Sequence, residues 1–104
     1  MAELVSREQA DGIVASKAAP RVTRESIEAK IASVNYHVFN DVLTLCLITM
    51  RNGFVLHGLS APASPAKYDK AVGERYAYDD AFRQLWPLEG YLLRERLTSG
   101  AAQE

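Results

Sequence analysis

The dipeptide Asn52-Gly53 limits the possible folds of this chain more than any other feature, because it stands between two runs rich in β-forming residues. Asn-Gly supplies the two positive-φ positions of a type I′ turn and is the strongest short-range signature of a β-hairpin. We therefore predict antiparallel strands over residues 42–50 and 54–59, joined by a two-residue loop. This register places Ile48 opposite His57 and Cys46 opposite Leu59.

The predicted hairpin has two faces, and both are apolar. The face expected to meet the helices carries Leu43, Leu45, Leu47, Phe54 and Leu56. The second face is still too apolar for open water and needs a cover, for which residues 36–39, the N-terminal arm and another subunit are the candidates. We favour a second copy, hence a homo-oligomer and most simply a dimer, because two-fold pairing of identical apolar patches is common. That second face carries Val42, Thr44, Cys46, Ile48, Met50, Val55, His57 and Leu59.

Helical patterns flank the hairpin on both sides. Thr23 is a plausible N-cap, and the spacing of Ile27 and Val34 predicts a helix ending near Val34. After the hairpin, Ser64-Pro65 reads as the start of a new helix, and Pro87 forces a kink or a fresh start. Adjacent antiparallel strands with segregated helices predict an α+β fold. We expect an N-terminal helix, a hairpin or three-stranded meander that includes residues 36–39, and C-terminal helices packed on one face.

The length and composition of the chain indicate one ordinary globular domain. Of the 104 residues, 48% are hydrophobic and 24% are charged. We expect a flexible arm over residues 1–21, a domain over 22–97 and a tail over 98–104. A single cysteine excludes an intrachain disulfide, and no apolar run reaches the roughly 20 residues that span a bilayer. We therefore expect a soluble protein of the bacterial cytoplasm with no membrane partner.

Two strings carry a family resemblance, Leu-Cys-Leu-Ile-Thr-Met-Arg-Asn-Gly-Phe-Val at 45–55 and Trp-Pro-Leu-Glu-Gly-Tyr-Leu-Leu at 86–93. Together with Tyr68-Asp69, Gly73, Ala77 and Ala81, they resemble a family of small bacteriophage and prophage proteins, those similar to phage gene product 49 or gene 66. The resemblance covers residues 24–97. It implies an accessory protein made inside an infected or lysogenic cell, and it brings no catalytic residues with it.

The sequence holds no recognisable catalytic, metal or cofactor motif. It has no P-loop, no G-x-G-x-x-G and no G-x-S-x-G. Cys46 and His57 share a face in the predicted register, but a cysteine among strand leucines is usually inert core. With His37 they still lack the closely spaced ligand pair of a zinc site. We therefore expect no enzyme, no metal and no cofactor.

The string from Trp86 to Tyr91 is the most distinctive candidate for a binding site. Its aromatic rings could stack on a ligand ring while Glu89 accepts hydrogen bonds. The alternative, which we favour, is that these side chains anchor the last helix to the sheet. The candidate ligand-binding residues are His37, His57, Trp86, Glu89 and Tyr91. The residues expected to serve structure are Asn52, Gly53, Pro87 and Gly90.

Three classes of function follow from these observations. The leading hypothesis is non-catalytic binding of a host protein or a small signalling ligand, which includes sequestration of a nucleotide signal. A DNA- or RNA-binding regulator is the second, with Arg7, Lys17, Arg21 and Arg24 as a basic arm. The net charge of −1 argues against it, because phosphate contacts need clustered Lys and Arg. An enzyme with an unrecognised site is the third.

Overall fold

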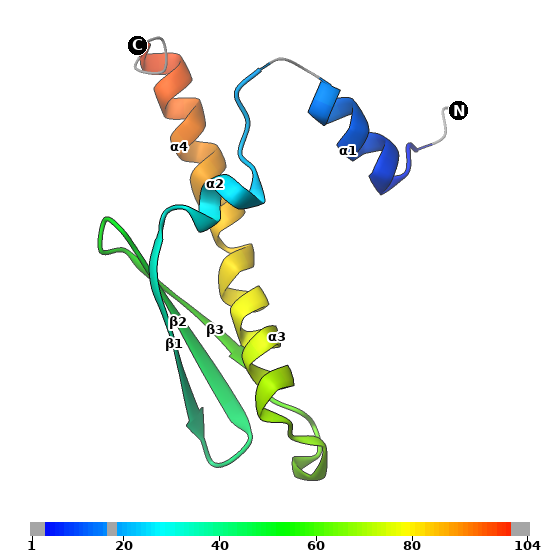
Figure 1. Ribbon diagram of the computed structural model, residues 1–104, viewed down its shortest axis with the longest axis vertical. Coiled ribbons are helices and arrows are strands. Elements are labelled where there is room, and N and C mark those ends of the chain that lie inside the picture. The colour runs from blue at the N-terminus through cyan, green and yellow to red at the C-terminus, as the bar shows by residue number, and fades with distance from the viewer. Residues whose placement is uncertain (1–3, 17–18, 101–104) are drawn as a thin grey trace.

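The computed structural model describes residues 4–16 and 19–100. A three-stranded antiparallel sheet, in the order β1-β2-β3, is covered by helices on one face (Figure 1). The predicted α+β fold, with the third strand, is therefore confirmed. Lys17 of the predicted basic arm, and parts of the predicted arm and tail, lie outside the described residues. The elements are α1 (Arg7–Ser16), α2 (Arg24–Glu28), β1 (Ile31–Phe39), β2 (Leu43–Met50), β3 (Val55–Ser60), a 3₁₀ turn (Pro65–Lys67), α3 (Lys70–Arg83) and α4 (Leu85–Ser99).

Helix α2 begins as predicted but ends early. The hydroxyl of Thr23 accepts a hydrogen bond from the Ser26 amide, and the Ser26 hydroxyl accepts one from the Thr23 amide, which completes a capping box. The predicted extension to Val34 is wrong, because Val34 lies in β1 opposite Ile48. A β-branched side chain suits a strand, and the ladder to β2 satisfies the backbone that a helix would have satisfied.

The hairpin between β2 and β3 has a three-residue loop, one residue longer than predicted. The Gly53 amide donates to the Met50 carbonyl, and the Met50 amide donates to the Phe54 carbonyl. Gly53 has φ of +90°, whereas Asn52 does not have positive φ. This is a type I turn followed by a glycine bulge. Two consecutive non-glycine residues with positive φ do occur in the described chain, but in the other loop of the sheet. They are Asn40 and Asp41, between β1 and β2.

The extra loop residue shifts the register by one and exchanges the faces of β3. Ile48 pairs with Leu56 and Cys46 with Gly58, instead of His57 and Leu59. Because side chains alternate along a strand, a one-residue shift turns each β3 side chain to the opposite face relative to β2. The predicted division of faces is therefore wrong for β2. It is right for β3, where Leu56 is buried beneath the helices and Val55, His57 and Leu59 lie on the other face. Ile48 and Met50, expected in an interface, lie in the core beneath the helices, and the leucines of β2 lie on the face that no helix covers.

Helix α3 packs on β2 and β3 through small residues. Gly73, Ala77 and Ala81 recur every four residues and are all buried. A methyl group on Gly73 would stand 2.6 Å from the Thr44 hydroxyl oxygen, and one on Gly58 would stand 2.2 Å from the Ala77 carbonyl oxygen. The helix therefore lies close to the sheet, and larger side chains fill the core around this contact. The buried apolar residues are Ile27, Cys46, Ile48, Met50, Leu56, Ala77, Ala81, Phe82 and Leu85.

Two predicted helix starts differ in detail. Ser64-Pro65 opens only a 3₁₀ turn, because Tyr68 is extended, and α3 starts at Lys70 with the Asp69 carboxylate accepting from the Val72 amide. The last helix begins at Leu85, two residues before Pro87. In the first turn of a helix the proline removes no hydrogen bond, since those amides have no partner within the helix.

The molecule is extended and thin. Its radius of gyration is 17.6 Å and its extents are 50 × 42 × 19 Å. A compact domain of this length has a radius of gyration of about 13 Å. Figure 1 shows the causes: α4 runs on beyond the sheet, and α1, which buries no residue, stands away from the sheet.

Candidate functional site

The structure spreads the five candidate ligand-binding residues over separate places. His37 and His57 project from the uncovered face of the sheet, where they pair across the strands with Leu45 and Leu47. Trp86 and Glu89 line two different hollows, and Tyr91 is 71% exposed on α4. The string from Trp86 to Tyr91 does not form one pocket, because successive residues of a helix point in different directions.

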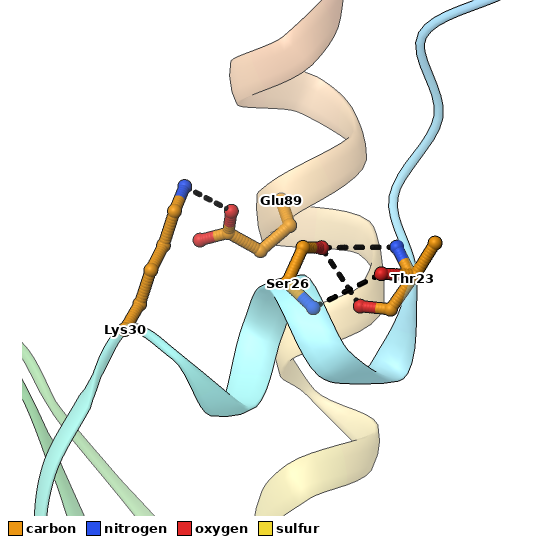
Figure 2. Close-up of polar contacts among 4 residues, drawn as sticks. All are labelled: Thr23, Ser26, Lys30 and Glu89. Atoms are coloured by element: carbon orange, nitrogen blue, oxygen red, sulfur yellow. Dashed lines mark hydrogen bonds and ion pairs between the residues drawn. The ribbon is translucent and has the colours of Figure 1, made fainter.

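The first hollow lies between the β2–β3 loop and α4, and has a volume of about 410 Å³. Lys30, just after α2, reaches the Glu89 carboxylate on α4 at 2.5 Å (Figure 2). The Lys30 carbonyl also accepts a hydrogen bond from the Arg51 amide at the start of the loop. The Glu89 side chain is only 14% exposed and already paired, so it holds α2 and α4 together. The lining residues are Lys30, Met50, Arg51, Asn52, Phe54, Leu85, Leu88, Glu89 and Leu92.

The second hollow, the arginine–aromatic hollow, lies on the side of α3 away from the sheet and has a volume of about 310 Å³. Tyr78, Phe82 and Trp86 form a row along α3 and into α4. Their ring centroids are 5.6 Å and 6.3 Å apart. Phe82 is buried, and Trp86 is 38% exposed at the end of the row. The hollow is lined by Arg24, Arg75, Asp79, Phe82, Arg83 and Trp86.

Two arginines of this hollow are already neutralised by carboxylates. Arg75 forms two hydrogen bonds to Asp79, with Nη2 2.5 Å from Oδ1 and Nε 3.2 Å from Oδ2. Arg83 pairs with Asp80 one turn along α3. The amide of Leu59 and then Arg83 lower the pKa of the Asp80 carboxyl, since both favour the charged form. Both carboxylates are therefore fixed as ion-pair partners.

Arg24 differs from these two arginines. Its guanidinium carbon lies 4.4 Å from the centroid of the Phe82 ring, a cation–π contact. None of the three ion pairs found across residues 4–16 and 19–100 includes Arg24. The guanidinium is thus held in place by the ring while its five N–H donors stay available. Beside it stands the exposed part of the Trp86 indole, which also lines the same hollow.

This combination suits one kind of ligand. A fixed guanidinium with available donors binds carboxylate or phosphate groups in a forked geometry. An exposed indole binds planar rings by stacking. A volume of about 310 Å³ lies at the lower end of the range of small-molecule sites. The arginine–aromatic hollow therefore fits a small anion that carries a flat ring.

The Cys46–His57 pair considered from the sequence does not exist in this fold. Cys46 is fully buried on the helix-covered face, and His57 lies on the opposite face. Burial raises the pKa of the Cys46 thiol from 9.0 to about 11, although a hydrogen bond with Tyr36 opposes the shift. A thiol nucleophile needs the reverse, a lowered pKa and exposure. His37, the third residue considered as a zinc ligand, also lies on the face opposite Cys46, so the three residues cannot share a metal ion.

The importance of Arg24 and Phe82 could not be inferred from the spacing alone. Residues 78, 82 and 86 follow i, i+4, i+8, a spacing that by itself predicts only an apolar helical face. One signal in the sequence was an arginine close to an aromatic residue of this row. Arg75 stands three residues before Tyr78, and its guanidinium carbon lies 5.5 Å from the centroid of the Tyr78 ring. Arg24 is distant in sequence, so only the fold brings it to Phe82.

Comparisons with known proteins place these observations in a family. A family model described as the "Phage protein (N4 Gp49/phage Sf6 gene 66) family" matches residues 22–97. Searches of curated proteins and of solved structures gave no match. Among the described helices, none is both long enough and apolar enough to cross a membrane. Within the same residues, no group of three or more His, Cys, Asp or Glu could hold a metal ion.

Proposed function

The chain belongs to this family of phage proteins, and we propose that it works in the cytoplasm of the infected cell by non-catalytic binding of a small anionic ligand with a planar ring. Nucleotides are the ligand class that best fits this description. The proposal rests on one observation: the guanidinium of Arg24 is held on Phe82 beside the exposed indole of Trp86 and makes no ion pair in the described chain.

The charges of the arginine–aromatic hollow favour binding over chemistry. A general acid needs a raised pKa near neutrality, whereas the pKa of Asp80, which pairs with the lining residue Arg83, is lowered. Asp79 is occupied by two hydrogen bonds from Arg75. The only cysteine is buried elsewhere. A binder that removes its ligand stoichiometrically, such as one that sequesters a nucleotide signal, needs only the site and enough copies of the protein.

Nucleic acid is the second ligand class, and one observation favours it. Arg21, Arg24 and Trp86 together line a neighbouring hollow of about 430 Å³ under α1. Asp11 and Glu25 line the same hollow, so its electrostatic attraction for a polyanion is weak. A host protein is the third class. The experiment below separates all three.

Trp86 is the only tryptophan, so its fluorescence reports directly on the hollow. We would titrate the whole chain with AMP, GMP, ATP and a cyclic dinucleotide, and separately with a single-stranded 20-mer. Nucleotides should quench the indole saturably. Arg24→Gln should weaken binding about 10- to 100-fold, because a charge-assisted hydrogen bond contributes roughly 1.5–3 kcal/mol.

Arg96→Gln is the matched control, since Arg96 lies in the last turn of α4, away from the hollow. It should bind as the unmodified chain does, and circular dichroism should show both variants folded. Isothermal titration with Trp86→Leu extends the test to the indole itself. Absence of quenching up to about 1 mM nucleotide, which corresponds to a binding free energy of roughly −4 kcal/mol, would contradict the proposal. Binding of the 20-mer alone would favour the nucleic-acid alternative, and no binding of either would leave a host protein.

A further inference from the structure

The first hollow, between the β2–β3 loop and α4, is lined mainly by apolar side chains. Met50 and Leu85 are buried at its base, where they are 6% and 2% exposed. Phe54, Leu88 and Leu92 line it as well, and each leaves between 43% and 53% of its surface in water. Single exposed apolar residues are ordinary on a protein surface, whereas several that line one concave volume are typical of a ligand site.

The volume of the first hollow limits the size of its ligand. It measures about 410 Å³, which lies within the range of small-molecule sites. A group as large as a water molecule takes up roughly 30 Å³. The hollow therefore has room for about a dozen non-hydrogen atoms of a ligand.

The polar groups of the first hollow are mainly hydrogen-bond donors. The Glu89 carboxylate, its acidic group, is already paired with Lys30 (Figure 2). The side-chain oxygen of Asn52 accepts from the Phe54 amide at 3.0 Å, which leaves the amide nitrogen of Asn52 as a donor. Arg51 is exposed and belongs to none of the three ion pairs found in residues 4–16 and 19–100. Two neighbouring donor groups and one positive charge without a partner are thus available to a ligand.

We propose that the first hollow is a second ligand site, which binds an aliphatic carboxylate of medium chain length. The alkyl chain would lie against Phe54, Leu88 and Leu92, and its burial removes apolar surface from water on both partners. The carboxylate would accept hydrogen bonds from Arg51 and Asn52, since a guanidinium matches the two oxygens of a carboxylate. A cationic head group on the same chain would instead meet the positive charge of Arg51.

This site is separate from the one proposed for the planar anion. The first hollow and the arginine–aromatic hollow share no lining residue. A saturating concentration of AMP should therefore leave the affinity for the aliphatic carboxylate unchanged. Each proposal can fail without the other, because the two are measured with different ligands.

Isothermal titration of the full chain with three probes tests the site. Decanoate has twelve non-hydrogen atoms and should bind saturably, one molecule to each chain. Decylamine carries the same chain with the opposite charge, and acetate carries the same head group without the chain. Neither should bind measurably up to about 1 mM, the concentration that corresponds to a weak specific complex. The comparison separates a site that needs both parts of the ligand from a sticky surface and from a simple anion site.

Two substitutions in the site have matched controls elsewhere on the chain. Arg51→Gln should weaken decanoate binding about tenfold, because it removes a charge-assisted hydrogen bond. Leu92→Ser should weaken it roughly fivefold, because part of the apolar contact is lost. The controls are Arg96→Gln and Leu97→Ser, which should bind as the unmodified chain does. Leu97 lies on the same helix as Leu92 and is also 43% exposed, but it does not line the first hollow.

Amide chemical shifts locate the bound decanoate. Shifts should move in the loop at residues 51–54 and in α4 at residues 88–92, and should stay constant in β1 at residues 33–39. Four results would overturn the proposal. They are no binding of decanoate up to about 1 mM, equally tight binding of decylamine, equal losses in the control variants, and shift changes centred on the uncovered face of the sheet.

Discussion

Gly58 of β3 lies directly against Ala77 of α3, so closely that a methyl group on Gly58 would stand 2.2 Å from the Ala77 carbonyl oxygen. The same methyl group would be 2.4 Å from the Ala81 amide nitrogen. Both neighbours are backbone atoms of a helix, which cannot rotate away as a side chain can. This contact sets the distance between helix and sheet and identifies which face of the sheet α3 covers.

Gly58→Ala should therefore be among the most destabilising single substitutions in the chain. We expect a loss of unfolding free energy on the order of 3 kcal/mol, the upper range for overpacking a core. Gly90→Ala is the matched control, because a methyl group there meets nothing within 4 Å and the position is inside α4. That control should gain about 0.5–1 kcal/mol from helix propensity. Urea titrations of both variants give the comparison, and equal effects would disprove the close contact.

Thr44 offers a substitution expected to stabilise the protein. Its side chain is fully buried, and its hydroxyl oxygen has no hydrogen-bond partner among the described residues. An unsatisfied buried hydroxyl costs about 1–3 kcal/mol. Thr44→Val keeps the shape and removes that cost, so the unfolding free energy should rise by about 1 kcal/mol. Thr49→Val, on the face of the sheet that no helix covers, is the control and should change the unfolding free energy little. A loss of stability in Thr44→Val would show that the hydroxyl has a partner.

Asp80 should make stability depend on acid pH. The Leu59 amide donates to its carboxylate, and with Arg83 this lowers the Asp80 pKa below 3.8. As the pH falls, the unfolded chain takes up a proton at Asp80 before the folded chain does. The stabilisation that the Asp80 carboxylate gives the folded state is therefore fully present above about pH 4. It is lost as the pH falls through the lowered pKa of the folded state. The stability difference between the unmodified chain and Asp80→Asn should therefore shrink below pH 4, whereas a Glu95→Gln control should not show this change. If the stability difference between the unmodified chain and Asp80→Asn did not change with pH, Asp80 would not be the cause of the acid dependence.

The hairpin shows what the sequence could predict and where it failed. Asn52-Gly53 located the turn correctly, because Gly53 has positive φ in either loop type. The dipeptide does not distinguish a two-residue loop from a three-residue loop with a glycine bulge. Usually the polar face of a strand resolves such a choice, but both faces of β2 are apolar. The remaining signal was Gly58, since a glycine within a strand marks close approach of another backbone.

The helices show a second limit, which is contact between distant segments. Local rules found the Thr23 cap and the break near Pro87, because capping and proline sterics act within one turn. They extended α2 to Val34, since a β-branched run at helical spacing resembles a helix until its partner strand is known. The position of Arg24 over Phe82 depends on packing between α2 and α3, which no local pattern contains.

Cys46 gives the last prediction, which concerns alkaline pH. Burial raises the pKa of its thiol from 9.0 to about 11 in the folded state. Below pH 9 the thiol is neutral in both states and affects stability only through packing, so Cys46→Ala should cost roughly 1–2 kcal/mol. Between pH 9 and 11 the unfolded thiol ionises while the folded one does not, and the unmodified chain loses stability. The alanine variant has no such thiol.

The stability gap between the unmodified chain and Cys46→Ala should therefore narrow as the pH rises from 9 to 11. Burial also raises the pKa values of Tyr36 and Tyr78, and the charge of an ionised Cys46 raises both further. Taking the difference between the two proteins therefore removes only the part of the tyrosine effect that does not involve Cys46. Urea titrations at pH 7, 9, 10 and 11 measure the gap. The native thiol should also react slowly with iodoacetamide at pH 8, because the thiolate is the reactive form. Rapid alkylation without unfolding, or a gap that stays constant with pH, would show that the thiol is accessible to water and would reopen its role as a nucleophile.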